Sequence, residues 1–208
     1  MIRRTLIAAL ILALTGCSTV ASGPSPIAQA PTYQVGDTWT MSNPRSGVGN
    51  RNVVSHVIDI QDDGEVIFTG GLGYVGGAPR YRWKDGAVEE VGTRERDIAQ
   101  RFVVLAGSGW QFLSFPLEVG KSWQFTKVGY SYGRAHQFTV ACRVWPHDDI
   151  QTKAGTFKAF RMTVEWAGQT PEYRLSNLHT FWYAPAVRFM VREQSTNFNW
   201  ELLSYRVR

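Results

Sequence analysis

Alternation of apolar and polar residues with a period of two is the feature that most constrains the fold of this chain. In Phe160–Trp166 every even position is apolar and every odd position is polar. Successive side chains of a β-strand point to opposite faces, so this segment predicts a strand with one buried and one solvated face. Shorter runs of the same kind occur at Val187–Val191 and around Val66 and Phe68. Half-buried strands of this type are typical of antiparallel sheets.

Turn signals separate these runs. Asp63-Gly64, Asp85-Gly86 and Ala154-Gly155 each offer a hairpin connection, because glycine adopts a positive φ at little steric cost. The sequence therefore predicts an all-β, mostly antiparallel domain, folded as a single curved sheet or an incomplete barrel with at most one short helix. The helix candidate is Thr93–Leu105, in which Ile98, Phe102 and Leu105 share a stripe. Residues 102–105 are equally compatible with a strand.

Two segments of the chain resemble each other. Gln34–Trp39 and Glu118–Trp123 share the pattern Val-Gly-x-(Thr/Ser)-Trp, which predicts a turn that places a tryptophan at the start of a strand. The repeat is compatible with two related halves or with the same turn chemistry arising twice.

The N-terminus has the organisation of an export signal. Arg3 and Arg4 precede an apolar run over Leu6–Leu14 that is roughly half the length of about 20 residues needed to span a membrane. The run ends in Leu14-Thr15-Gly16-Cys17, which resembles the lipobox of bacterial lipoproteins. The resemblance implies cleavage before Cys17, attachment of diacylglycerol with chains such as palmitate to its sulfur, and anchoring in a membrane. Ser18 after the cysteine implies, by the same analogy, sorting to the outer membrane with the body facing the periplasm.

These features divide the chain into a signal peptide over 1–16, a lipidated N-terminus and flexible tether over 17–32, and one β-rich domain over 33–208. The tether is expected from the Ser-, Gly- and Pro-rich composition of residues 18–32. Removing Arg3 and Arg4 leaves 20 basic and 17 acidic residues, a formal charge of +3. No run of Lys or Arg occurs, so nucleic-acid binding is not expected. Contact with anionic lipid or glycan is compatible with this charge.

Cys142 is the second of the two cysteines. With Cys17 acylated it has no disulfide partner within the chain. It alternates with Phe138, Val140 and Val144, which predicts a small buried side chain rather than a nucleophile.

Several segments also resemble landmarks of a large, poorly characterised group of bacterial β-rich lipoproteins and periplasmic proteins. They are Pro116–Trp123, Ala154–Phe160, Phe181–Pro185 and Glu201–Tyr205. The group commonly has Gly-Val-Gly after Tyr-Ala-Pro, where this chain has Ala186-Val187-Arg188, so the turn there is expected to differ. The resemblance implies fold and compartment, and it carries over no catalytic residue.

The motifs that suggest chemistry are weak. Gly71–Gly76 matches the dinucleotide-binding pattern GxGxxG, but Pro79 and the strand-like Tyr81-Arg82-Trp83 follow where a helix is required, so a loop is predicted. His147-Asp148-Asp149 offers three cation ligands, yet adjacent residues point apart, which favours a solvated hairpin tip. The remaining histidines, His56, His136 and His179, show no metal-ligand spacing. The carboxylate pairs Asp62-Asp63 and Glu89-Glu90 face opposite sides of an extended chain, and Glu165 is expected to meet water. No catalytic residue, cofactor or metal is predicted.

The eight tryptophans are spread through the expected strands: Trp39, Trp83, Trp110, Trp123, Trp145, Trp166, Trp182 and Trp200. Most are expected in the core, and any exposed on the open face of a curved sheet would form a binding surface. The sequence therefore predicts a non-enzymatic cell-envelope lipoprotein that binds a partner protein or an apolar or glycan ligand. The alternatives are an envelope hydrolase assembled from sequence-distant residues, such as His56, His136 or His179 with a carboxylate, and a purely structural lipoprotein.

Overall fold

The computed structural model describes residues 26–42, 53–60, 66–69, 78–84, 87–96, 102–106, 113–131, 134–169, 174–196 and 199–208. Within these ranges the chain forms fourteen strands and one short 3₁₀ turn. The elements are β1 (Ile27–Ala28), β2 (Thr38–Met41), β3 (Val53–Ile60), β4 (Val66–Thr69), β5 (Ala78–Lys84), β6 (Ala87–Arg96), β7 (Phe102–Ala106), β8 (Leu117–Glu118), β9 (Ser122–Ser131), β10 (Arg134–Thr152), β11 (Gly155–Gln169), β12 (Arg174–Ala184), η1 (Pro185–Val187), β13 (Phe189–Ser195) and β14 (Asn199–Arg206).

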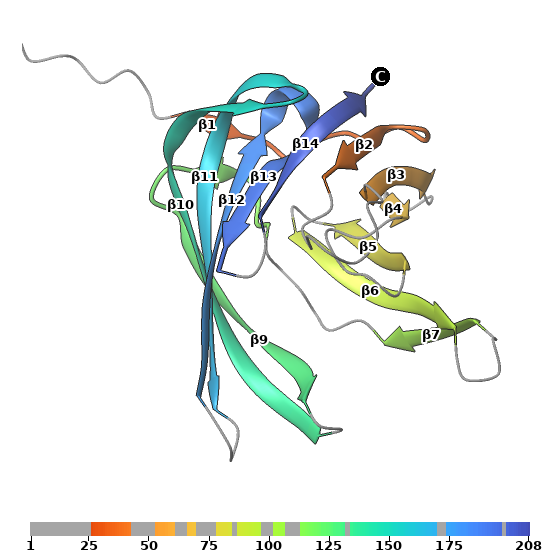
Figure 1. The fold of residues 1–208 in the computed structure, drawn as a ribbon, viewed down its shortest axis with the longest axis vertical. Helices are drawn as coiled ribbons and strands as arrows, with labels where there is room; N and C mark the ends of the chain where they lie inside the picture. The colour runs from red at the N-terminus through yellow and green to blue at the C-terminus, as the bar shows by residue number, and fades with distance from the viewer. Residues whose placement is uncertain are drawn as a thin grey trace, which may run out of the picture.

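Nine strands form one open antiparallel sheet in the order β4-β3-β2-β14-β13-β12-β11-β10-β9. From β9 to β14 the sheet is a meander, and the pairing of β2 with β14 joins the early and late parts of the chain. Figure 1 shows this order running from β9 on one side of the molecule across β12–β14 to β2–β4 on the other. A three-stranded sheet, β5-β6-β7, follows β4, and β1 pairs with β8. The predicted all-β, mostly antiparallel fold with a curved, open sheet is confirmed.

One prediction about secondary structure was wrong. Thr93–Leu105 does not form a helix, because its described parts belong to β6 and β7, which pair from Arg96↔Phe102 to Gly92↔Ala106. The strand alternative for residues 102–105 is therefore confirmed. Within the stretch 17–32 predicted as a tether, Ile27 and Ala28 pair with β8 and Ala28 is buried.

The expected turns fall where strands reverse. In the β10–β11 hairpin Thr152 pairs with Gly155, whose φ of 135° only glycine adopts readily. Lys84 pairs with Ala87, so two residues connect β5 and β6, and β3 pairs with β4 on either side of residues 61–65. Asp63-Gly64 and Asp85-Gly86 themselves lie outside the described residues.

Both Val-Gly-x-x-Trp segments form the predicted turn. Gly36 and Gly120 have φ values of 92° and 90°, and each turn is closed by a backbone hydrogen bond, Asp37 N–H to Gln34 O and Lys121 N–H to Glu118 O. Trp39 and Trp123 are the second residues of β2 and β9.

The third position distinguishes the two turns. In the first it is Asp37, whose side chain is fully buried and accepts hydrogen bonds from the backbone N–H groups of Gln34 and Arg208, both at 2.9 Å. Its Oδ2 also lies 3.1 Å from Nη2 of Arg188. In the second turn the third position is Lys121. Its side-chain amine donates hydrogen bonds to the backbone carbonyls of Ser114 and Pro116 and not to groups of its own turn.

Arg188 lies in the turn that was expected to differ from the lipoprotein group. It has φ 58° and ψ 22°, the left-handed conformation that glycine favours. Its carbonyl accepts a hydrogen bond from the Tyr33 hydroxyl at 2.7 Å, and its guanidinium donates to the carbonyls of Thr32 and Arg208. An arginine therefore has a glycine-like backbone conformation here and joins the segment before β2 to the C-terminal residue.

The core lies around this junction. Trp39 stacks on Phe189 with ring centroids 4.5 Å apart, and its indole N–H donates to Val187 O. The tip of the β10–β11 hairpin reaches β14, where the Ala154 N–H donates to Leu202 O at 3.1 Å. Hairpin, η1 and β14 thus enclose the upper end of the sheet in Figure 1.

Candidate functional site

One face of β9–β13, called here the inner face, carries the candidate site. The strand register places Trp123, Cys142, Val164, His179 and Ser195 in one row across five strands. Directly opposed residues of neighbouring antiparallel strands project to the same side of the sheet, so these five side chains share a face. The opposite face, called the outer face, carries the alternate residues of the same strands.

Half-exposed aromatic side chains flank fully buried ones on the inner face. Phe125, Val140 and Trp166 form the row adjacent to Trp123 and Cys142. Val140 and Cys142 on the middle strand are 1% and 2% exposed, whereas Trp123, Phe125 and Trp166 are only partly buried. Trp123 and Phe125 on β9 and Trp166 on β11 thus present aromatic side chains on either side of the small, buried residues of β10.

A buried hydrogen bond between a histidine and a carboxylate lies at the border of this aromatic surface. His179 Nδ1 is 2.7 Å from Oε1 of Glu193, and the side chains are 10% and 8% exposed. The Trp200 indole N–H donates to Oε2 of the same carboxylate. Both carboxylate oxygens therefore have a nitrogen partner, as a carboxylate removed from water requires.

Aromatic rings fix the position of His179. Its ring stacks on Phe181 at 5.9 Å with an interplanar angle of 7°, and Trp166 lies 5.9 Å away at 37°. The site thus combines an apolar aromatic surface with one buried pair of polar groups, the composition of a typical small-ligand site. His179 and Glu193 lie 14 positions apart in the sequence, so only the register of β12 with β13 brings them together.

The prediction that His147-Asp148-Asp149 forms a hairpin tip was wrong. These residues lie within β10, beyond a bulge between Val144 and His147, and the hairpin tip lies at Lys153 and Ala154. His147 packs edge-on against Phe160 at 4.0 Å, and burial lowers the pKa of its imidazole. Asp148 instead accepts a hydrogen bond from Trp182.

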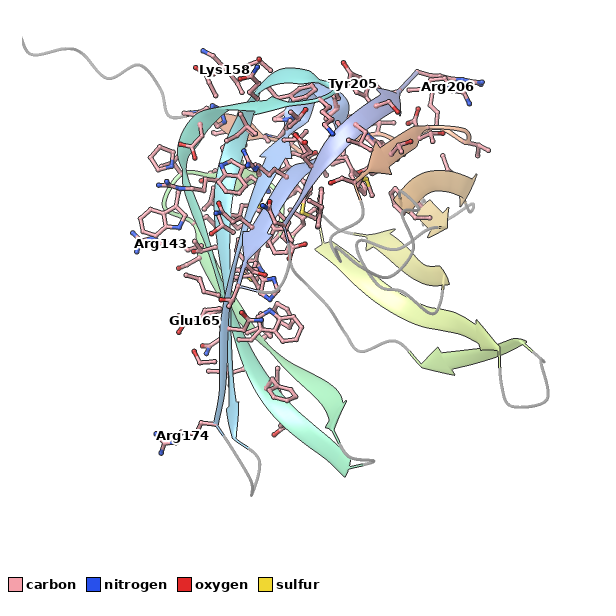
Figure 2. The ribbon with its side chains drawn as sticks, viewed as in Figure 1. Arg143, Lys158, Glu165, Arg174, Tyr205 and Arg206 are labelled. Atoms are coloured by element: carbon pink, nitrogen blue, oxygen red, sulfur yellow. The ribbon has the colours of Figure 1, made fainter. Side chains whose placement is uncertain are left out.

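Cys142 is buried, as predicted, and burial raises the pKa of its thiol to about 12. Among the described residues no group of three His, Cys, Asp or Glu side chains is placed to hold a metal ion. The prediction that Glu165 faces solvent is confirmed, and Figure 2 shows it projecting from the outer face.

The tryptophans divide between core and surface. Trp39, Trp182 and Trp200 are buried, whereas Trp123, Trp145 and Trp166 are half-buried. Most tryptophans were expected in the core, and three of these six are buried there. Nothing is described of the Trp83 side chain or of Trp110.

Other predicted residues lie outside the described parts of the chain. They are Cys17, the Gly71–Gly76 motif, Asp62-Asp63 and the side chains of His56, Glu89, Glu90 and His136. Strands β4 and β5 flank the glycine motif, in agreement with the strand expected after it. In the ranges that are described, no helix is long and apolar enough to cross a membrane.

No protein-family model matches the chain, and no curated protein matches it in sequence. Its fold is similar to that of solved structures. A protein described as a putative lipoprotein from Parabacteroides distasonis has a TM-score of 0.50 at 14% identity, over 87% of this chain and all of that one. The chain shares its β-rich fold with that protein.

Two further structures are less similar. The hypothetical lipoprotein YmcC from Escherichia coli has a TM-score of 0.43 at 10% identity, covering 86% of this chain and 89% of that one. An exported protein from Bacteroides fragilis, described as having a YmcC-like fold, has a TM-score of 0.42 at 12% identity, covering 86% and 99%.

Proposed function

We propose that this protein is a non-enzymatic cell-envelope lipoprotein, anchored through Cys17 in the outer membrane, whose body binds an apolar ligand on the inner face of its sheet. The fold shared with a bacterial lipoprotein supports the compartment, and the lipobox resemblance supports the anchor. The observation that carries ligand binding is the half-exposed set Trp123, Phe125 and Trp166 over the buried residues of β10.

The anchor is tested in cells. Metabolic labelling with an alkyne analogue of palmitate should label the wild-type protein and fail to label Cys17→Ala. Labelling that persists in Cys17→Ala would contradict lipidation at this residue. Cell fractionation of the labelled protein separates outer-membrane from inner-membrane anchoring.

Ligand binding is tested with the uncharged fluorescent probe N-phenyl-1-naphthylamine, added to the mature chain carrying Cys17→Ser. The probe should bind, and Trp166→Ala should weaken binding about tenfold, the equivalent of about 1.4 kcal/mol. Tyr205→Ala is the matched control, because Tyr205 is an exposed aromatic residue of β14 outside the inner-face rows. Equal binding by both variants and the wild type would reject the inner face as an apolar-ligand site. Glycan arrays and pull-downs from envelope extract would then test the other ligand classes.

A hydrolase is the second candidate, and the His179–Glu193 pair favours it. In serine hydrolases a carboxylate accepts from Nδ1 of the histidine while Nε2 serves as the base. Ser195 is the cross-strand neighbour of His179 and supplies a hydroxyl on the same face. Hydrolysis of p-nitrophenyl esters that is lost in both His179→Gln and Ser195→Ala would establish this activity. Activity absent from the wild type, or unchanged in Ser195→Ala, would reject it.

A further inference from the structure

The outer face carries a cluster of arginine and tryptophan side chains that the inner-face site does not use. It spans four adjacent strands and is called here the Arg–Trp patch: Arg143 and Trp145 on β10, Arg161 on β11, Trp182 on β12 and Arg192 on β13. Trp182 and Arg161 are cross-strand partners, as are Trp182 and Arg192, so the patch is continuous across the sheet.

The bulge in β10 helps to form the patch. Between Val144 and His147 two residues of β10 lie opposite one residue of β11, and an extra residue of this kind redirects side chains. The indole N–H of Trp145 donates to Thr163 Oγ1 at 2.9 Å, which fixes the ring against the outer face. Cζ of Arg143 then lies 4.3 Å from the ring centroid, and Cζ of Arg161 lies 5.6 Å from it. Both guanidinium groups are thus held in place by one indole.

Positive charge exceeds negative charge within the patch. Asp148 Oδ2 accepts a hydrogen bond from Trp182 at 2.9 Å and lies 3.8 Å from Nε of Arg161. Arg192 lies over the second indole, with Cζ 6.0 Å from its centroid, and its buried Nε has no hydrogen-bond partner among the described residues. Of the three guanidinium groups, that of Arg161 lies beside Asp148. Glu201 on β14 is the cross-strand partner of Arg192, and Glu165 borders the patch on β11, so the excess of positive charge is concentrated at Arg143 and Arg161.

The outer face beside the patch also exposes an apolar side chain. Leu178 is the cross-strand partner of Glu165, which places it on the outer face, and it is 54% exposed. Arg143 is exposed, and the Arg161 side chain is 40% exposed. Figure 2 shows Arg143 and Glu165 projecting from the side of the sheet that faces away from β5–β7.

We propose that the outer face docks on the anionic, phosphate-bearing surface of the membrane, with the Arg–Trp patch as its contact. This inference rests on the proposed function, because the acyl chains on Cys17 would hold the body at that surface. The chain from Cys17 to Pro26 spans at most about 30 Å when extended, which keeps the body within reach of the headgroups. β1, where the described chain begins, lies at the end of the sheet that carries the β10–β11 hairpin (Figure 1).

The residue types of the patch suit such a surface. Arginine places its guanidinium among phosphates while its stem covers apolar surface, and tryptophan, here the partly exposed Trp145, is enriched at membrane–water interfaces. Trp182 is buried and supports Arg192 from below. Acyl anchoring combined with basic residues gives firmer attachment than either alone.

The test is co-sedimentation of the non-acylated mature chain, Cys17→Ser, with vesicles of phosphatidylcholine alone or with 30% phosphatidylglycerol. Binding should require phosphatidylglycerol and weaken with salt. Arg143→Gln should reduce the partition coefficient about fivefold, whereas Arg143→Lys should retain most of it because the charge persists. Arg206→Gln is the control, since Arg206 is an exposed arginine on β14, far from Arg143 in Figure 2, and its substitution makes the same change in net charge.

Equal losses in Arg143→Gln and Arg206→Gln would overturn the proposal, because they would show an effect of net charge alone. Binding to phosphatidylcholine alone that matches binding to the mixed vesicles would also overturn it. A third arm uses soluble polygalacturonate. Loss of polygalacturonate binding in Arg143→Gln with vesicle binding unchanged would assign the patch to an acidic glycan instead. The comparison of Arg143→Gln with the wild type concerns the outer face, whereas Trp166→Ala in the probe assay concerns the inner face and palmitate labelling concerns Cys17, so the three failures are distinguishable.

Discussion

At the scale of single residues, Arg188 combines an unfavourable backbone conformation with a favourable ion pair. A non-glycine residue in the left-handed region costs about 1 kcal/mol. Arg188 occupies it with φ 58°, and its guanidinium neutralises the fully buried carboxylate of Asp37. Removing the positive charge leaves Asp37 with two backbone N–H donors but without its counter-ion.

Arg188→Ala should therefore lower the free energy of unfolding by about 3 kcal/mol, as expected when one member of a buried pair is removed. Arg188→Gly loses the same ion pair but relieves the backbone strain, so it should be about 1 kcal/mol more stable than Arg188→Ala. Urea denaturation of both variants measures the difference. An alanine variant as stable as the glycine variant would show that the left-handed conformation costs nothing here.

Cys142 gives a second prediction at the residue scale. The thiolate is the reactive form, and burial raises the pKa of this thiol to about 12, so almost none is ionised at pH 8. In the Cys17→Ser protein, a maleimide reagent should react at pH 8 only as fast as the protein opens, and at full speed in concentrated guanidinium chloride. Rapid labelling of the folded protein would contradict the buried position of Cys142.

At the scale of elements, the pairing of β10 with β11 depends on a glycine. Phe138 and Gly168 are directly opposed, and a Cβ added to Gly168 would lie 2.2 Å from Cδ1 of the Phe138 ring. The ring therefore packs over a backbone without a side chain, and it is 7% exposed. An aromatic residue covering a cross-strand glycine compensates for the packing that glycine lacks.

Gly168→Ala should destabilise the protein by about 1–3 kcal/mol through overpacking. In the Phe138→Ala background, where the ring is absent, the same substitution should be close to neutral. Thermal or urea unfolding of the two single variants and the double variant gives the coupling energy between the positions. A coupling energy near zero would show that the ring moves aside without cost.

Sequence patterns predicted the elements that contain strict alternation and failed where register or packing decides. Phe160–Trp166 was identified as a strand because polar and apolar residues alternate without interruption. The sequence did not predict the bulge at Trp145 and Pro146. A bulge places two residues of β10 opposite one residue of β11, so it depends on how the two strands pair and not on the sequence of β10 alone. The helix predicted over Thr93–Leu105 failed because pairing with β7 outweighed a weak helical stripe.

The candidate site was predictable only in part for the same reason. The tryptophans were considered only as a group for an exposed surface, and the alternation in Phe160–Trp166 placed Trp166 on the buried face. His179 was one of three histidines considered as a partner for a carboxylate. The identity of that carboxylate, Glu193, depends on how β12 aligns with β13, which a single sequence does not specify. The Arg–Trp patch likewise combines residues from four strands and has no signature in any one of them.

At the scale of the whole molecule, burial changes along the length of the sheet. Phe160, Met162 and Val164 in one half of β11 are at most 1% exposed, and the hairpin, η1 and β14 enclose that end. Further along the same strand Glu165 and Ala167 are exposed and Trp166 is only partly buried. Both halves pair with β10 and β12, so the ladder of hydrogen bonds continues while the packing changes.

Native-state hydrogen exchange should therefore differ within this one strand. Amides of Phe160–Val164 should exchange by global unfolding, whereas those of Glu165–Gly168 should exchange at least tenfold faster through local opening, because fewer buried contacts resist it. Mass spectrometry of overlapping peptides resolves the two halves, and each peptide serves as the control for the other. Equal exchange would mean that the long strands open as one unit, with hydrogen bonding rather than burial setting the stability. The same measurement on Gly168→Ala tests the role of Phe138. Faster exchange confined to Glu165–Gly168 would show that the packing of Phe138 on Gly168 stabilises this half of the strand.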